Sequence, residues 1–313
     1  MGSSSVSEKT ARPVQCEVGG VIIPSVGMLG TLQQQNHCCM RKEYLSAPLP
    51  FVGQKRMFAK EYKRILSTLD DNAVFVDLFG GSGLLSHITK YNKPNATVVY
   101  NDYDNYRRRL ENIERTNKLL ADLRETVKCC PRHKLIDKST RERIFQRLER
   151  EEQSGFVDYI TISSSLLFSM KYVLSLDELR KEGMYNNIRK NDYSCNGYLD
   201  GLVIESCDYK ELFNRYKDNP NVVFLVDPPY LCTEVGTYNM SWRLGDYLDV
   251  LTVLQGKRFV YFTSNKSSIV ELCNWLGNNK NLGNPFEDAN KVEFNAHMNY
   301  NSHYTDIMLY RIA

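Results

Sequence analysis

The 313-residue sequence lacks the motifs that mark several common classes of protein. It contains no C-x-x-C pair, so a zinc site has little support, and no G-K-[ST], which argues against a loop that binds a nucleotide triphosphate. It also lacks a long apolar run, because residues 21–32 are too short and too broken by proline and glycine to span a membrane. No charged-then-apolar signal peptide is present. We therefore expect no metal site and no membrane attachment.

Cysteine is present but forms no disulfide framework in the sequence. There are nine cysteines, an odd number, and they follow no repeating spacing. Cys38-Cys39 and Cys129-Cys130 are adjacent pairs, and neighbouring cysteines rarely bridge to each other. Free thiols indicate a reducing compartment, so we expect the protein in the cytoplasm.

Positive charge is concentrated in one part of a chain whose formal net charge is only +3. Residues 107–150 hold fourteen lysines and arginines against seven acidic residues, so the rest of the chain is net acidic. Such a segment is a candidate for contact with the phosphates of a nucleic acid. The alternative is a solvated helical face with internal ion pairs, as in Arg141-Glu142-Arg143, and the sequence leaves both open.

A second stretch, at 176–198, combines basic residues with aromatic and amide side chains. Lys181, Arg189 and Lys190 are interleaved there with tyrosines and asparagines. This mixture suits contact with nucleic acid. Surface loops rich in asparagine and tyrosine are also common, so the pattern alone does not decide between the two.

The strongest local pattern is the segment Val222-Val223-Phe224-Leu225-Val226-Asp227-Pro228-Pro229-Tyr230. Five apolar residues, mostly β-branched, predict a fully buried strand. The prolines give a stiff, extended turn at the carboxyl end of that strand, where open α/β sheets place their ligands. Asp227 has no basic neighbour in the sequence and stands near the ring of Tyr230, which suits a flat polar substrate. The alternative is a strand that simply ends in a proline-rich turn.

Residues 73–83 form a second pattern, in which a short buried strand at Val74–Val76 ends at Asp77. Glycines at 80, 81 and 83 follow, and a helix is predicted from Leu84. The glycines let a ligand approach the backbone closely, and the first N–H groups of the helix face it. Strand, acid, glycine loop and helix in this order predict a ligand site, although the full G-x-G-x-x-G is absent.

Two flanking segments extend this predicted site. The next strand, from Val98, ends at Asp102 and Asp104, and an acid in this place commonly accepts hydrogen bonds from both ribose hydroxyls. The alternative role is an N-cap for the following helix, and two acids can serve both. Upstream, Gly53 allows a close backbone approach, and Lys55 places a cation near a helix start, where it does not help the helix dipole. These segments predict a site for an adenosine-containing cofactor.

Strands and helices alternate along the chain, which predicts a doubly wound α/β sheet of six or seven strands. We expect a poorly patterned leader at 1–46, a catalytic domain formed by 47–106 and 200–313, and a helical, basic insertion at 107–199. A helix within 156–174 is expected to pack on the sheet. Further helices are predicted at 57–69, from 84, within 106–152, after the polar turn that ends near 209 and through 216, and at 269–276. Strands are predicted at 74–76, from 98, from 203, at 222–226, from 258, at 291–294 and at 305–312.

The strand ending in D-P-P-Y, together with the D-x-F-x-G-x-G loop from Asp77 to Gly83, resembles the S-adenosylmethionine-dependent DNA adenine methyltransferases (deoxyadenosine methylases). The segment order fits the alpha arrangement of that family over residues 48 to 313. Phe51-Val52-Gly53-Gln54-Lys55 is similar to its N-terminal cofactor motif, although Gln54 stands where the family has a second glycine. Segments 101–104, 205–209 and 262–265 resemble its ribose-binding segment, its adenine-binding segment and the strand after the catalytic one. The family's basic target-recognition hairpin has no clear match.

The resemblance implies a seven-stranded, mostly parallel sheet of the Rossmann-like methyltransferase fold. It implies site-specific transfer of a methyl group from S-adenosylmethionine to the amino group of adenine in double-stranded DNA, with a cognate restriction enzyme as an expected counterpart. The implied catalytic residues are Asp227, Pro228, Pro229 and Tyr230. The implied cofactor-binding residues are Gly53, Gln54, Lys55, Asp77, Phe79, Gly80, Gly81, Ser82, Gly83, Asp102, Asp104, Asp208 and Tyr209.

These residues permit a specific mechanism. The amino group of adenine is a poor nucleophile because its lone pair is delocalised into the ring. Asp227 and a backbone carbonyl of the proline turn can each accept one amino hydrogen, which exposes the lone pair for attack on the sulfonium methyl group. Tyr230 would stack on the base, which must first be flipped out of the duplex.

Two alternatives remain at this stage. The same fold can act on adenine in RNA, on the amino group of cytosine or on a protein glutamine. Related cytosine enzymes more often carry serine at the position of Asp227, and glutamine enzymes asparagine, so the aspartate favours adenine. The second alternative is an idle, methyltransferase-like nucleic-acid-binding subunit, but such proteins usually lose the acid or the glycines that are present here.

Overall fold

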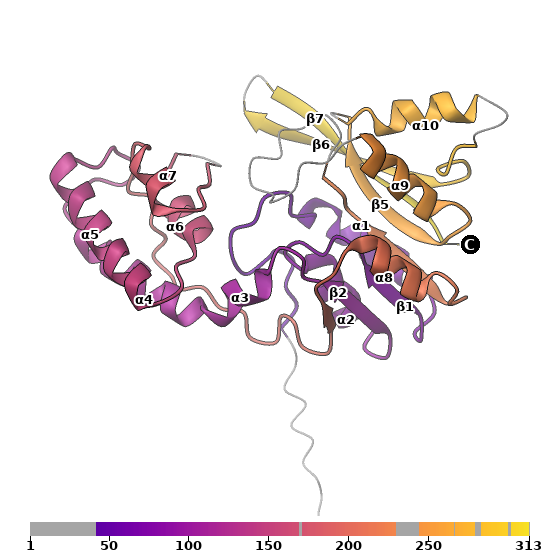
Figure 1. Ribbon diagram of the computed structural model, residues 1–313, viewed down its shortest axis with the longest axis horizontal. Coiled ribbons are helices and arrows are strands. Elements are labelled where there is room, and N and C mark those ends of the chain that lie inside the picture. Colours follow the sequence, from indigo (N-terminus) through magenta and orange to yellow (C-terminus); the bar gives the residue numbers. More distant parts are fainter. Residues whose placement is uncertain are drawn as a thin grey trace, which may run out of the picture. The chain divides into compact units, whose positions relative to one another are not determined.

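The computed structural model describes residues 42–168, 171–229, 244–265, 267–278, 283–299 and 302–312. Its centre is a seven-stranded sheet with the strand order β3-β2-β1-β4-β5-β7-β6 (Figure 1). β1 to β5 pair in parallel, whereas β7 is antiparallel to both β5 and β6. The predicted doubly wound, mostly parallel sheet is therefore confirmed. The strands are β1 (Val74–Asp77), β2 (Thr97–Asn101), β3 (Val203–Glu205), β4 (Val222–Val226), β5 (Phe259–Ser264), β6 (Asn290–Asn299) and β7 (Ser302–Arg311).

One face of the sheet is covered by the first helices of the chain. These are the 3-10 turn η1 (Arg56–Phe58), α1 (Ala59–Leu66) and α2 (Leu84–Asn92). They share a buried apolar cluster with every second residue of the central strands, including Phe75, Val223 and Leu225. This alternation follows from the two-residue period of a strand. The helix predicted over 57–69 is confirmed, but it begins as a 3-10 turn and its α-helical part ends at Leu66.

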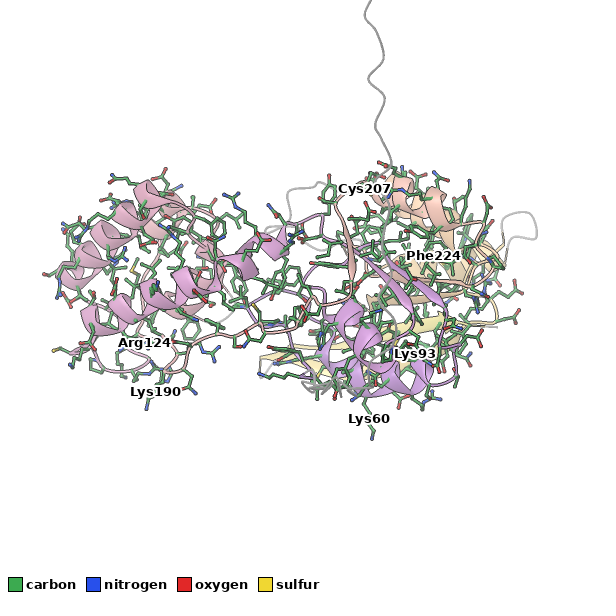
Figure 2. The ribbon with its side chains drawn as sticks, turned by 90° about the horizontal axis from the view of Figure 1, so that it is seen from below. Lys60, Lys93, Arg124, Lys190, Cys207 and Phe224 are labelled. Carbon is green, nitrogen blue, oxygen red and sulfur yellow. The ribbon has the colours of Figure 1, made fainter. Side chains whose placement is uncertain are left out.

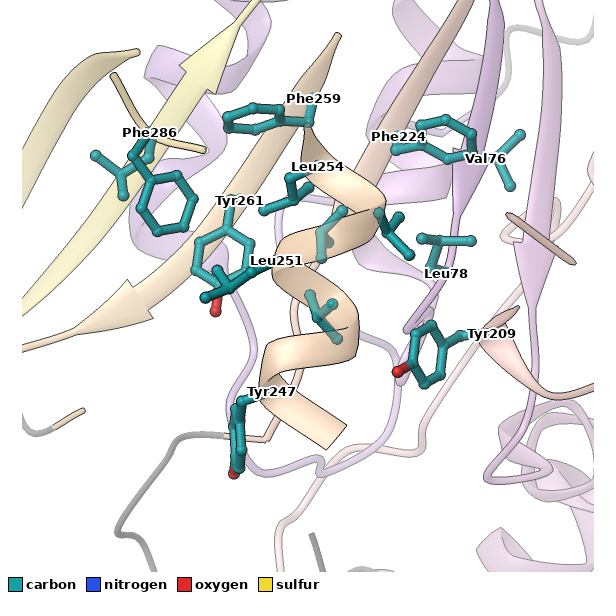
Figure 3. Close-up of a cluster of buried hydrophobic side chains, with 14 of the residues drawn as sticks. Val76, Leu78, Tyr209, Phe224, Tyr247, Leu251, Leu254, Phe259, Tyr261 and Phe286 are labelled. Atoms are coloured by element: carbon teal, nitrogen blue, oxygen red, sulfur yellow. The ribbon is translucent and has the colours of Figure 1, made fainter. Parts of the chain in front are cut away.

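The opposite face is covered by α8 (Tyr209–Tyr216), α9 (Leu244–Leu254) and α10 (Ile269–Gly277). Figure 3 shows α9 directing Leu251 and Leu254 toward the sheet, beside Tyr261 and Phe259 of β5. No helix was predicted at α9, although its apolar residues recur with helical spacing. Because both faces are covered by helices, the carboxyl edge of the sheet is the place left for a ligand. None of the helices in the described ranges is long and apolar enough to cross a membrane.

Between β2 and β3 the described chain is helical and has an apolar core of its own. It contains α3 (Tyr106–Glu111), α4 (Ile113–Thr126), α5 (Lys138–Ser154), α6 (Tyr159–Leu166) and α7 (Leu176–Arg180) (Figure 1). The prediction that the 156–174 helix packs on the sheet is wrong. The buried residues of α6, such as Ile162 and Leu166, join a cluster with α4, α5 and α7 that contains no strand residue. The apolar stripes of α4 and α5 bury α6, and the sheet faces are already covered.

The segment before η1 is tied into the fold from both sides. Tyr44 and Leu49 are buried in a cluster with Tyr106 of α3 and Tyr198. The backbone N–H of Tyr44 donates to Nε2 of His87 on α2 at 3.0 Å. The buried Arg109 of α3 donates to the carbonyl of Pro50 at 2.9 Å and to Asp158, which caps α6, at 3.0 Å. The segment is thus fixed to α2 and to the helical insertion before it reaches the sheet edge.

Candidate active site

Two carboxylates stand at the ends of neighbouring parallel strands. Asp77 is the last residue of β1, and Asp227 follows the last residue of β4. β1 and β4 are paired, with Asp77 in register with Leu225. The strand order changes direction between them, which is where open α/β sheets bind ligands. The turn residues Pro228 and Pro229 follow at this edge, whereas Tyr230 lies outside the described residues.

A lysine lies against the carboxylate of Asp227. Lys55 Nζ is 2.6 Å from Asp227 Oδ2, and the two side chains are 8% and 20% exposed. The same ammonium donates to the carbonyl of Gly53 at 2.8 Å. Asp227 has no basic neighbour in sequence, but it has one in space. This pair forms because the segment before η1 reaches the end of β4, a long-range contact that no local pattern in the sequence reports.

Burial changes the acidity of both carboxylates. Burial raises the pKa of Asp227 above its ordinary value, the charge of Lys55 opposes this rise, and the charge of Asp306 on β7 adds to it. Burial also raises the pKa of Asp77 to about 7, while a hydrogen bond from Ser86 Oγ at 2.7 Å opposes the shift. Carboxylates with raised pKa values in a cleft are typical of functional sites.

The glycine loop between β1 and α2 is pressed against β2. A Cβ added to Gly80 would lie 2.3 Å from two ring carbons of Tyr100 and 2.8 Å from the carbonyl of Asn101. The ring cannot retreat, because Tyr100 is fully buried and its hydroxyl donates to the carbonyl of Gly81 at 2.8 Å. Gly81 and Gly83 have φ values of +49° and +73°, which disfavour any residue with a side chain. The loop therefore needs glycine for both space and backbone conformation.

These elements line a cavity that is partly open to solvent. The glycine loop lines it, and so do Asp227 and Pro229. A concave site with a mostly apolar lining and a few carboxylates suits a small-molecule ligand. The predicted residues on its wall are Gly53, Phe79, Gly80, Gly81, Asp104, Asp208, Tyr209, Asp227 and Pro229.

The other predicted cofactor residues support the wall without forming it. Gln54 accepts from the backbone N–H of Ala47 at 2.9 Å, and the carbonyl of Ser82 accepts from Tyr198. Gly83 begins α2 and bonds to Gly80 within the loop. Asp77 is buried behind the loop, where its Oδ1 has no hydrogen-bond partner among the described residues.

The two acids after β2 divide the roles that the sequence left open. Asp102 is buried and accepts from the backbone N–H groups of Tyr106 at 2.6 Å and Arg107 at 2.9 Å. It therefore caps the start of α3. Asp104 lines the cavity, and no hydrogen bond to its side chain is found in the described chain. Asp104 is accordingly the acid of this pair that is placed to meet a ligand.

Several wall residues were not among the predicted contacts. Asn101 lies between the glycine loop and β3, donating to the carbonyls of Leu78 at 3.0 Å and Cys207 at 2.9 Å. Phe51, Val52, Tyr103 and Cys207 also line the cavity. The sequence contains a signal for Asn101, a polar residue that ends a buried strand. Phe51 and Val52 belong to a segment that was recognised, but their side chains carry no polar group that marks a contact.

Comparison with known proteins bears directly on this site. Residues 51–255 match the family described as D12 class N6 adenine-specific DNA methyltransferase. The chain belongs to this family. A relative from Haemophilus influenzae (strain ATCC 51907 / DSM 11121 / KW20 / Rd), named "Putative methyltransferase", is 34% identical over 284 residues, which is 87% of this chain and 94% of that protein.

As a D12 class enzyme, the protein transfers a methyl group from S-adenosylmethionine to N6 of adenine in DNA. The matched region runs from the N-terminal wall of the cavity through the whole helical insertion and β4 to the last turn of α9. Both patterns that carried the resemblance, the glycine loop and the D-P-P-Y strand, fall inside it. The family assignment from sequence is confirmed.

The cavity fits the cofactor of the D12 class. The tilted rings of Phe79 and Tyr209, with centroids 4.9 Å apart, form an apolar wall suited to a flat adenine ring. Carboxylates at 104 and 208 line the same space and can accept from hydroxyl or ammonium groups. Asp77 Oδ1 is buried next to the glycine loop and has no hydrogen-bond partner among the described residues, so a carboxylate oxygen is left that a cationic group could satisfy. Residues and ligand chemistry therefore agree.

The Lys55–Asp227 pair predicts a shift in the pH dependence of turnover. Substitution Lys55→Met removes a charge that lowers the pKa of Asp227, so that pKa rises. If the ionised carboxylate is the active form, activity is present above this pKa and lost below it. The acid limb of the kcat profile is therefore expected to move to higher pH. The control is Lys63→Met, which removes a partly exposed lysine paired with Glu43 and should leave the acid limb where it is in the wild type. Identical acid limbs in Lys55→Met and Lys63→Met would contradict the effect of Lys55 on the pKa of Asp227.

Proposed function

We propose that this methyltransferase acts at specific sites in duplex DNA, on an adenine flipped out to the sheet edge, with Asp227 as the group that contacts the amino nitrogen. The observation that carries this proposal is that Asp227 lines the cavity at the end of β4 and is ion-paired with Lys55. An adenine inside a duplex cannot reach a carboxylate in such a recess, so the base must leave the stack, at a cost of a few kcal/mol.

Asp227 and the proline turn would activate the amino group by hydrogen bonding. One amino hydrogen is accepted by the Asp227 carboxylate and the other by a backbone carbonyl of the turn, for which we assign Pro228. These bonds reduce the delocalisation of the lone pair and orient it toward the cavity. Bound S-adenosylmethionine supplies an electrophilic methyl group there. Lys55 keeps the carboxylate in its accepting, ionised form, and we assign the stacking role to Tyr230.

We assign ribose recognition to Asp104 and structural capping to Asp102, and paired substitutions separate the two. Asp104→Asn is expected to raise the dissociation constant for S-adenosylmethionine about 10- to 100-fold, because charge-assisted hydrogen bonds are lost. Its melting temperature should stay close to that of the wild type. Asp102→Asn is expected to bind the cofactor as the wild type does, but to lose about 1–2 kcal/mol of folding stability because the cap of α3 is weakened. Calorimetric titration and thermal unfolding measure both, and a cofactor defect confined to Asp102→Asn would reverse the assignment.

The helical insertion is the part of the chain to which we assign DNA binding. Many of its cations serve the fold: within 107–150, ion pairs are formed by Arg107, Arg109, Arg115, Arg124, Lys128 and Arg147. The remaining eight cations of that segment have no carboxylate partner in the described residues. The interpretation as a solvated, ion-paired face therefore accounts for about half of the basic residues and leaves the other half for phosphate contacts.

The proposal extends to the setting of the enzyme. We place it in the cytoplasm, in keeping with the five cysteines that the described residues contain, all of them free. A cognate restriction endonuclease, which would cleave the same sequence when it is unmodified, is the counterpart that we propose.

Competition between nucleic acids tests the choice of substrate. Labelled S-adenosylmethionine is offered with unmethylated duplex DNA in the presence of increasing structured RNA. We expect label in DNA at RNA concentrations well above that of the DNA, since the insertion would engage the duplex. Preferential labelling of RNA would overturn the proposal that duplex DNA is the substrate.

A further inference from the structure

The 184–193 segment of the insertion is held rigidly although it contains no helix or strand. Its first half runs antiparallel to the 133–136 segment, with backbone bonds from His133 to Asn186 at 3.0 Å and from Ile136 to Met184 at 2.8 Å. On the other side, the N–H of Tyr185 donates to the carbonyl of Leu166, at the end of α6. The buried Asn186 side chain donates to the carbonyl of Cys130 at 2.8 Å. This half is therefore fixed between two neighbours.

The second half is held by α4. The side-chain amide of Asn117 bonds both the N–H and the carbonyl of Tyr193, each at 2.9 Å. Arg124 pairs with Asp192 at 2.6 Å. Amide side chains that satisfy both backbone groups of one residue replace the bonds that a sheet would provide, so the segment keeps one conformation.

Between these anchors, three consecutive polar side chains are exposed to solvent. Arg189, Lys190 and Asn191 are exposed, and none of them has an ion pair or side-chain hydrogen bond within the described chain. The guanidinium of Arg189 lies over the ring of Tyr193 at 4.0 Å, which orients its planar fork. Figure 2 shows Lys190 projecting outward on the same edge of the insertion as Arg124. We call residues 189–191 the polar strip.

The polar strip borders a hollow in the surface. Ser164 and Asn187 line it together with the strip and Tyr193, and the same two residues line an adjoining hollow that contains Phe168. Phe168 is 69% exposed and pairs with Tyr185 at 5.7 Å. Cations, amides and an exposed aromatic ring on one rigid surface match the chemistry of a nucleic-acid groove.

We propose that the polar strip reads base edges in the recognition site, with Arg189 contacting a guanine and Lys190 a neighbouring phosphate. This inference rests on the proposed function of the insertion. Guanine presents two acceptors in the major groove that an arginine fork meets together, whereas lysine suits a phosphate as a point charge. The segment is held in place before DNA arrives, so little conformational freedom is lost on binding.

A library of random-sequence duplexes tests the proposal, with methylated sites mapped by sequencing. Arg189→Ala is expected to relax the methylated site at one base pair and to lower kcat/KM on the wild-type site about 5- to 150-fold. Arg189→Lys keeps the charge but not the fork, so it should relax the same base pair with a smaller loss. Lys190→Ala should weaken binding evenly across sequences and reduce the slope of its salt dependence by about one.

Arg143→Ala is the matched control, because Arg143 is an exposed arginine of the same insertion with no partner among the described residues. It changes the net charge equally. Because Arg143 is one of the cations left for phosphate contacts, the change can weaken binding evenly across sequences, but it should leave the methylated sequence unchanged. If the wild-type enzyme methylates a defined sequence and both Arg189→Ala and Arg189→Lys methylate the same sequence, this inference is overturned while the proposed function stands. A wild-type enzyme that methylates no DNA would overturn the proposed function, and this inference with it. Cofactor affinity and melting temperature are expected to be unchanged in all variants. Any change in the methylated sequence then comes from altered DNA contacts and not from altered cofactor binding or folding.

Discussion

Substitution Asp227→Asn is expected to lower kcat at least about 100- to 1,000-fold while cofactor affinity changes little. Replacing a carboxylate oxygen by an amide removes the charge that would accept the amino hydrogen of adenine, and loss of one such preorganised group has this magnitude in other enzymes. Asparagine keeps the volume of the side chain and can still accept from Lys55. The change therefore separates chemistry from folding, and single-turnover kinetics with saturating cofactor measure it.

The alanine variant at the same position has a second effect. Asp227→Ala removes the carboxylate that pairs with the ammonium of Lys55, which is 8% exposed, and breaking a buried ion pair by removing one partner costs about 3–5 kcal/mol. Asp249→Asn is the control, because that carboxylate pairs with Lys210 at the surface, where both partners are about half exposed. It should have no measurable effect on turnover. Turnover of Asp227→Asn at the rate of this control would contradict the role given to Asp227.

Substitution Gly80→Ala is expected to abolish cofactor binding at ordinary concentrations without touching a reacting group. The added methyl carbon would lie 2.3 Å from the ring of Tyr100 and 2.8 Å from a backbone oxygen, so the glycine loop must shift away from β2. Strain of this kind costs about 1–3 kcal/mol. Because the loop lines the cofactor site, its displacement is expected to raise the dissociation constant for S-adenosylmethionine at least about 100-fold relative to the wild type. Equilibrium titration with S-adenosylmethionine measures this change.

Gly245→Ala provides the comparison for this prediction. Gly245 lies in the first turn of α9, and a Cβ there would meet nothing within 4 Å. Alanine also favours a helix, so this variant should match or slightly exceed the wild type in stability and bind cofactor normally. Equal affinity in Gly80→Ala and Gly245→Ala would show that the glycine loop does not line the cofactor site.

The central strands could be predicted from sequence because each is an apolar run that ends at an aspartate. β4 reads as five apolar residues before Asp227, and β1 as an apolar run before Asp77, so neither required knowledge of the rest of the chain. Parallel strands buried on both faces give this signal directly. The place of both acids at one sheet edge then follows from the topology.

Contacts between distant segments could not be predicted in this way. Nothing beside Lys55 in the sequence indicates that it pairs with Asp227, and its assignment to the cofactor followed a motif instead. The choice between Asp102 and Asp104 depended on which side chain faces the start of α3. The helix over 156–174 was assigned to the wrong partner because an apolar sequence shows that a helix is buried but not which surface buries it.

The most direct test is methyl transfer from labelled S-adenosylmethionine to unmethylated duplex DNA, followed by digestion to nucleosides. The wild-type enzyme is predicted to place the label in N6-methyldeoxyadenosine, and Asp227→Asn to place almost none there under the same conditions. Label in cytosine, or equal label in adenine from both proteins, would contradict the account of the site at the end of β4.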